Sequence, residues 1–165
     1  MRRYIYGGTL AAAAALALAA TAAAHHKPGH PHGNGNGQQK AASAGVACVL
    51  NTQLRAANEP PVLSTARGHA HLTVLKNGQL RFRVHILNKA GENFVAGHIH
   101  LTATSAIVQG LFSGPATTAK QIRIANTIAI DPALATGLCT TPTNYYVNFH
   151  TTADPAGAIR GNFKS

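Results

Sequence analysis

Tryptophan is absent from the chain, and acidic side chains are scarce. The 165 residues contain 4 Asp and Glu against 14 Lys and Arg, so the formal net charge is +10. So few carboxylates leave little room for general acid and base catalysis by paired acids, and few oxygen ligands for calcium or magnesium. The 10 histidines are therefore the main candidates for chemistry, and imidazole favours copper, zinc and nickel.

Aromatic residues make up only 5% of the chain, and the basic residues are scattered singly along it. This pattern argues against a nucleic-acid partner, which requires massed basic residues, and leaves a general attraction to anionic surfaces. No nucleophile elbow and no glycine-rich phosphate loop occurs in the sequence. The length allows one compact domain at most, so a multidomain enzyme is excluded.

The first segment predicts export from the cytoplasm. Met1-Arg2-Arg3 is positively charged, residues 10–20 are apolar, and small residues precede a cleavage site near Ala24. Residues 1–24 are therefore interpreted as a signal peptide. No later apolar stretch approaches the length of a membrane span, so we expect a secreted, periplasmic or extracellular protein.

Residues 25–40 contain no apolar side chain able to enter a core and are rich in Gly, Asn and Gln, and we predict that residues 25–44 form a disordered tail. A flexible histidine-rich tract either binds metal weakly or serves only as a solvated spacer. If cleavage follows Ala24, the first histidine also offers its amine to copper. The candidate tail ligands are His25, His26, His30 and His32.

From residue 45 to residue 165 the pattern changes to short β-strands. Apolar residues recur at every second position in two segments, at Gly68, Ala70, Leu72 and Val74 and at Leu80, Phe82, Val84 and Ile86. Pairing Val74 with Leu80 as a hairpin requires a three-residue loop, residues 76–78, and puts His69 opposite His85. The two histidines would then share the outer face.

Two further strands carry histidines with a defined direction. On a strand spanning residues 94–102, alternation puts His98 and His100 on one face and the apolar residues, including Val95, on the other. In the last hairpin, matching the apolar faces puts His150 directly opposite Arg160 or one pair away from it. Two histidines on one face of a strand form a bidentate platform for a metal.

Cys48 and Cys139 are the only cysteines. In an exported chain, the oxidising compartment favours a bridge between them. We therefore predict one disulfide. A further local prediction is a single helical turn that begins with Asp131 as the cap and Pro132 in the first position.

Four motifs, in this order and spacing, resemble the CHRD domain, which is named after chordin and is widespread in secreted bacterial proteins. They are Glu59-Pro60-Pro61-Val62, Gly97-His98-Ile99-His100, Tyr146-Val147-Asn148-Phe149-His150-Thr151 and Pro155-Ala156-Gly157-Ala158-Ile159-Arg160-Gly161. The resemblance implies an all-β protein with a single immunoglobulin-like or superoxide-dismutase-like antiparallel β-sandwich, and it implies no settled activity.

A second resemblance is to copper-zinc superoxide dismutases. Their copper-binding histidines and nearby arginine correspond in character to His98, His100, His150 and Arg160. The chain has no second histidine loop with an aspartate that would form the bridging zinc site. A copper-only site is compatible with this difference, and a complete dismutase site is not.

Three interpretations follow. In the first, the domain binds copper or zinc through His98, His100 and His150, and Arg160 biases the remaining position on the metal towards water or an anion. In the second, it is an extracellular adhesion or structural domain that contacts other proteins or an anionic surface, and the histidines form a hydrogen-bonded cluster. In the third, it is a copper-only dismutase-like enzyme. The sequence favours the first interpretation, with the second as its alternative, and a role without catalysis over the third.

Overall fold

The computed structural model describes residues 44–59 and 62–165. The predicted signal peptide, the histidine-rich tail and the prolines at positions 60 and 61 lie outside these residues. The described part contains eight strands, one α-helix and two short 3₁₀-helices. They are β1 (Val46–Arg55), η1 (Ala56–Asn58), β2 (Arg67–Leu75), β3 (Gln79–Leu87), β4 (Phe94–Leu101), β5 (Ile107–Thr117), β6 (Gln121–Ala129), α1 (Pro132–Thr140), η2 (Pro142–Asn144), β7 (Tyr145–Thr151) and β8 (Ile159–Asn162).

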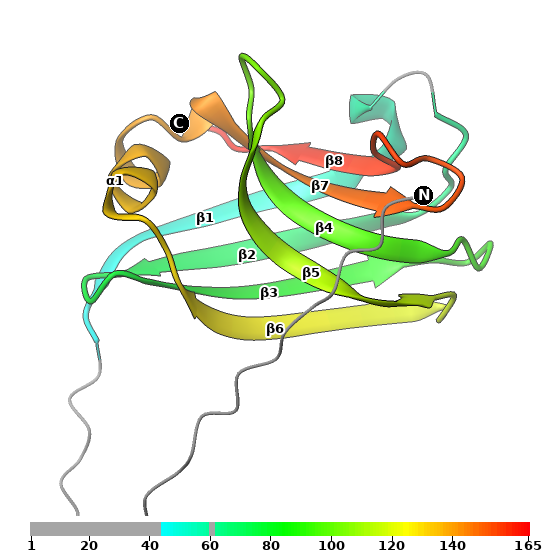
Figure 1. Cartoon of the computed structure of the whole chain (residues 1–165), viewed down its shortest axis with the longest axis horizontal. Coiled ribbons are helices and arrows are strands. Elements are labelled where there is room, and N and C mark those ends of the chain that lie inside the picture. The colour runs from blue at the N-terminus through cyan, green and yellow to red at the C-terminus, as the bar shows by residue number, and fades with distance from the viewer. Residues whose placement is uncertain (1–43, 60–61) are drawn as a thin grey trace, which may run out of the picture. The chain divides into compact units, whose positions relative to one another are not determined.

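All strand pairs are antiparallel, and the strands form one continuous sheet in the order β5-β4-β7-β8-β1-β2-β3-β6. The sheet curls so that the half made of β5, β4, β7 and β8 packs over the half made of β1, β2, β3 and β6 (Figure 1). The core between the halves draws on both, including Leu72 and Phe82 from one and Ile99 and Phe149 from the other. The predicted all-β antiparallel fold is confirmed.

The hairpin of β2 and β3 has the predicted register. Val74 pairs with Leu80 and His69 pairs with His85, and Gly78 closes the loop with φ of +78°. Glycine has no Cβ, so it adopts this left-handed conformation at little cost. The apolar positions of both strands are buried, which confirms that alternation decided the register here.

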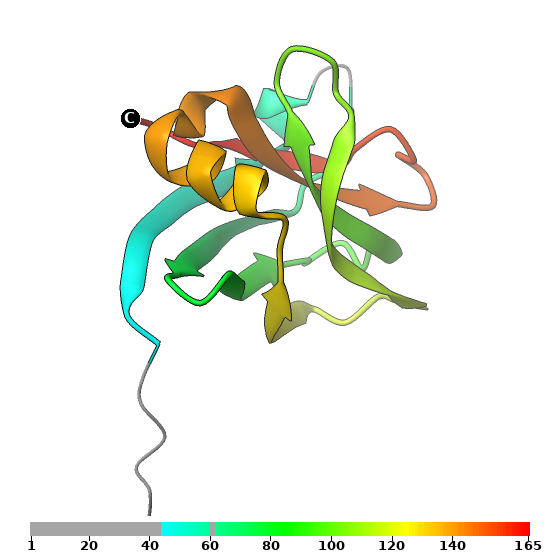
Figure 2. The same cartoon turned by 60° about the vertical axis from the view of Figure 1, so that its left-hand side comes forward.

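The helix is longer than the sequence predicted. Asp131 accepts hydrogen bonds from the backbone N–H groups of Ala133 and Leu134, as a cap does, but α1 continues for nine residues instead of one turn. Leu134 and Leu138 lie one turn apart and both enter the core, so tertiary packing extends the helix. Figure 2 shows α1 at one end of the sheet.

No helix among residues 44–59 and 62–165 has the length and apolar character needed to span a bilayer.

The predicted disulfide is present. It joins Cys48 of β1 to Cys139 of α1, residues that are 91 positions apart, with their Cα atoms separated by 5.6 Å. Both cysteines pack against the core. The bridge therefore ties the helix to the first strand of the sheet.

The core face of β4 differs from the prediction at one end. The alternation placed Val95 in the core, but Phe94 is the residue that is fully buried there. The pairing of β4 with both neighbours is irregular between Phe94 and Ala96, and a bulge of this kind shifts the residues that precede it to the other face. Beyond the bulge the predicted phase holds, with Gly97 against Phe149 and Ile99 in the core.

Candidate metal centre

Three histidines meet on the outer face of the half-sheet formed by β5, β4, β7 and β8. His98 and His100 lie on β4, and their neighbour Ile99 points into the core. His150 lies on β7, where it pairs with Ala96, two positions before His98 on β4, and therefore shares the face of His98. We call these three residues the histidine cluster. The cluster depends on the pairing of β4 with β7, because His98 and His150 are about 50 positions apart in the chain.

The ring nitrogens of the cluster lie close enough to share an ion. One potential ligand atom from each histidine lies within 4.8 Å of the others. His98 Nδ1 is 3.1 Å from His150 Nε2. Two nitrogens bound to one tetrahedral metal at 2.0–2.1 Å are about 3.3 Å apart, so this pair already has the required spacing.

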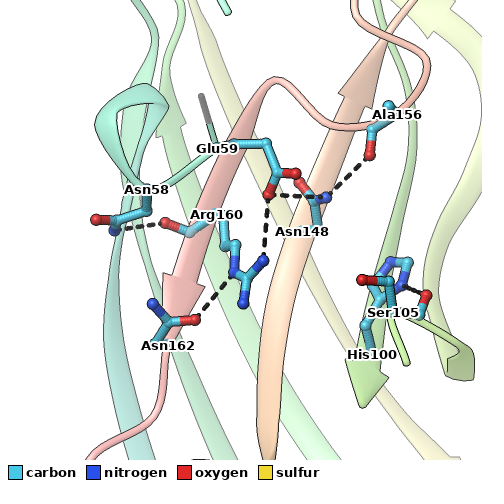
Figure 3. Close-up of polar contacts among 8 residues, drawn as sticks. All are labelled: Asn58, Glu59, His100, Ser105, Asn148, Ala156, Arg160 and Asn162. Carbon is cyan, nitrogen blue, oxygen red and sulfur yellow. Dashed lines mark hydrogen bonds and ion pairs between the residues drawn. The ribbon is translucent and has the colours of Figure 1, made fainter. Parts of the chain in front are cut away.

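His100 holds one nitrogen free. Its Nδ1 donates to the backbone carbonyl of Ser105 at 2.9 Å (Figure 3), so Nε2 carries the lone pair. That Nε2 is buried and has no hydrogen-bond partner among the described residues. Ser105 has φ of +58°, a left-handed conformation that costs a non-glycine residue about 1 kcal/mol and that shapes the loop around this carbonyl.

His150 is oriented in the same way by a second loop. Its Nδ1 donates to the backbone carbonyl of Pro155 at 3.0 Å, so its Nε2 also carries a lone pair. This lone pair faces His98, whose Nδ1–H donates to it. A metal bound between these two nitrogens would take the place of that proton, and His98 would then carry its proton on Nε2, so that both rings stay neutral. Hydrogen bonds from the second ring nitrogen to a carbonyl are the usual means by which proteins orient histidine ligands.

The surroundings of His98 and His150 favour the neutral form of both rings. Burial lowers the pKa of His98 below its ordinary value of 6.5, and the proximity of His150 and His100 lowers it further. Burial also lowers the pKa of His150; the hydrogen bond to Pro155 opposes this shift and the proximity of His100 adds to it. Metals bind the deprotonated imidazole, so the lowered pKa values of His98 and His150 favour metal binding over protonation.

Arg160 lies beside the cluster and reaches it through an aromatic ring. Its guanidinium carbon is 3.4 Å from the centre of the Tyr146 ring, and that ring is stacked on His100 with 5.0 Å between centres and 8° between planes. Arg160 comes from β8 and His100 from β4, the two strands that flank β7. Tyr146 is therefore clamped between a cation and a candidate ligand.

Arg160 is held in turn by polar contacts that the sequence did not predict. Glu59 forms an ion pair with it at 3.8 Å and also accepts from Asn148 at 3.5 Å (Figure 3). The Nε of Arg160 donates to Asn162 at 2.9 Å. Glu59 lies in the motif that contains the two prolines, so residues of all four motifs meet on this side of the domain.

His69 and His85, which the sequence places on the outer face of the first hairpin, do not join the cluster. His69 and His85 pack edge to face on the outer surface of β2 and β3, with ring centres 5.6 Å apart, and no third ligand joins them in the described part of the chain. The contacts of Tyr146, Ser105 and Pro155 with the rings of the cluster were not predicted from the sequence. For Tyr146 a signal existed, since its alternation with His150 places both on the same face of β7.

The lowered pKa values predict that the metal-free domain loses stability in mild acid. Below pH 6.5 the unfolded chain protonates His98 and His150, whereas in the folded domain these two rings resist protonation. The unfolded state therefore binds more protons, and the free energy of unfolding decreases as the pH falls. Urea unfolding at pH 7.5 and pH 5.5, with a chelator present, measures this. The double variant His98→Asn/His150→Asn should show a smaller decrease, and an equal decrease in both proteins would contradict the explanation.

Comparison with known proteins gives one match. The model of the CHRD domain matches residues 50–163, a span that contains every strand that carries the site. No curated protein matches, and no solved structure matches. Since the family model covers more than half of the chain and all three members of the histidine cluster, the chain belongs to the CHRD domain family.

Proposed function

We propose that the domain binds one transition-metal ion, copper or zinc, through His98, His100 and His150. The observation that carries the proposal is the buried Nε2 of His100, which has no hydrogen-bond partner in the described residues and lies beside two other imidazole nitrogens. A buried polar atom without a partner is costly. A metal ion shared with the other two histidines would satisfy it.

Copper is the better candidate of the two metals on affinity. The cluster consists of three neutral imidazoles, a donor set that suits both ions, and nitrogen sites bind Cu²⁺ more tightly than Zn²⁺. Tyr146 and Arg160 act as positioning residues, since they hold the ring of His100.

We also propose that the protein is exported and that residues 1–24 are removed, because a disulfide such as Cys48–Cys139 is typical of oxidising compartments.

Metal titration of the full chain tests the proposal. The four tail histidines are first replaced with glutamine, so that any remaining binding belongs to the domain; the substitutions are His25→Gln, His26→Gln, His30→Gln and His32→Gln. Calorimetry with Cu²⁺ and with Zn²⁺ should give one ion per chain, and electron paramagnetic resonance of the Cu²⁺ form should show nitrogen coordination. Absence of binding for both ions would refute the proposal.

The second candidate is an adhesion or structural domain that uses no metal. One observation favours it: the hydrogen bonds from His98 to His150 and from His150 to Pro155 already link two strands and a loop without an ion. In this case the cluster stabilises the fold by itself. The same titration separates the candidates, because a purely structural cluster has no affinity for Cu²⁺ beyond that of isolated surface histidines.

A further inference from the structure

The outer face of the other half-sheet has a one-sided charge. Strands β1, β2, β3 and β6 contain no Asp or Glu. Their outward positions instead carry cations and imidazoles, which we call the arginine face: Arg55, Arg67, Arg81, Arg83, Arg123, His69, His71 and His85. All five arginines of this face are exposed.

The strand register brings these groups together in rows across the sheet. Arg55 pairs with Arg67. In the next row, His69 pairs with His85, which pairs with Arg123. In the row after that, His71 pairs with Arg83. Arg81 lies two positions before Arg83 on β3 and so shares its face. Neighbouring strands are about 4.8 Å apart, so the like charges on adjacent strands repel one another.

The acidic residues of the domain are engaged elsewhere. Glu59 pairs with Arg160, Glu92 accepts from the backbone N–H groups of Thr65 and Ala66, and Asp131 caps α1. Asp154 lies in the loop between β7 and β8. Within residues 44–59 and 62–165, no ion pair involves an arginine of the arginine face. The charge of this face is therefore not neutralised within the described residues and is available to attract an anionic molecule.

The surface of the arginine face carries three hollows that adjoin one another at one residue. One hollow of about 650 Å³ is lined by Arg55 and Lys164, among others. A second, of about 460 Å³, is lined by Arg83 and Arg123, and a smaller one of about 120 Å³ lies at Arg67. All three are lined by His69. A set of adjoining open hollows lined by cations suits an extended chain with repeated negative charges better than a small anion.

We propose that the arginine face binds an acidic polysaccharide, a sugar chain with repeated carboxylate or sulfate groups. The guanidinium group donates two parallel hydrogen bonds to the planar carboxylate or to the oxygens of a sulfate, and every cation on these four strands is an arginine. Several weak contacts along one chain add up through multivalency. The face is separate from the histidine cluster, so this proposal does not depend on metal binding.

Nucleic acid fits the arginine face less well. The one Phe, Tyr or Trp of the four strands is Phe82, and it is buried in the core, so the face offers only the smaller imidazole rings for stacking on the bases of a single strand. A duplex is read by a helix or a two-stranded ribbon that enters a groove, whereas a broad four-stranded face enters none. DNA is therefore the alternative that the experiment must exclude.

The test uses the full chain with a chelator present, which removes any contribution from bound metal. The probes are alginate, with carboxylate groups, dextran sulfate, with sulfate groups, and a DNA duplex, each titrated at low and at moderate salt. The parent protein should bind at least one of the polysaccharides, more weakly as salt rises. The double variant Arg83→Gln/Arg123→Gln should bind at least about tenfold more weakly, and so should Arg55→Gln/Arg67→Gln.

The matched control is Lys76→Gln/Lys89→Gln, which removes the same charge from exposed loop residues outside the arginine face. Its affinity should stay within about threefold of the parent. Equal losses in the arginine variants and the control would reduce the effect to net charge and overturn the proposal. Binding of neither polysaccharide, or tighter binding of the DNA duplex, would also overturn it. Thermal unfolding of each variant verifies the fold.

Discussion

Replacing His98 with alanine will lower the affinity of the domain for Cu²⁺ by at least about 100-fold. Loss of a group that only supports a metal ligand costs up to about 100-fold in affinity, and His98 is proposed as a ligand itself. The reason is geometric. His98 Nδ1 and His150 Nε2 are already 3.1 Å apart, so loss of His98 removes one of three convergent nitrogens and leaves a two-ligand site. Calorimetric titration of the chain that lacks the tail histidines measures the change.

His98 is the most informative of the three positions because its ring is half exposed, whereas His100 and His150 are buried. Its removal should therefore cost the fold little, and the thermal midpoint of the metal-free variant should stay close to that of the parent. His69→Ala, on the opposite half-sheet, is the matched control and should bind Cu²⁺ as the parent does. If His98→Ala and His69→Ala bind equally well, the histidine cluster is not the metal site.

Removing the disulfide will lower the free energy of unfolding more than any other substitution proposed for this domain. The bridge closes a loop across 91 positions, and the chain-entropy model assigns about 4 kcal/mol to a loop of this size. In addition, Cys139 ties α1 to β1, so the helix that carries the buried Leu138 loses its covalent tie to the sheet. Urea unfolding of Cys48→Ser/Cys139→Ser should show the decrease in the free energy of unfolding.

The controls separate the covalent bond from the substitution. The parent protein unfolded in the presence of a reductant should lose a comparable free energy, and labelling of the denatured, unreduced parent should find no free thiol. A double variant with the same unfolding midpoint as the oxidised parent would show that the bridge constrains the unfolded chain far less than the loop length implies.

The sequence predicted those features that depend on neighbours in the chain. The register of β2 and β3 follows from strict alternation over both strands and from Gly78 at the turn, since a one-residue slip would expose every buried side chain of the hairpin. The disulfide follows from the presence of only two cysteines in a chain that is predicted to be exported. The common direction of His98 and His100 follows from the two-residue period of a strand.

The features that the sequence missed depend on distant parts of the chain. The length of α1 was underestimated because the burial of Leu138 against the sheet, a tertiary effect, carries the helix beyond its first turn. The core position of Phe94 in place of Val95 required the bulge in the pairing of β4 with β5 and β7. Local alternation contains no information about either.

For the site, the amino-acid sequence by itself determined which side chains are available: few carboxylates, two histidines on one strand face, a third beside Arg160, and arginines on alternating positions of strands without acids. Tertiary structure alone decided which of them meet. The pairing of β4 with β7 puts His150 against His98, two loops supply the carbonyls of Ser105 and Pro155, and the pairing of β3 with β6 adds Arg123 to the arginine face. The physical reason is that a strand's period fixes the direction of each side chain locally, whereas its neighbour in the sheet is chosen by the burial of the whole core.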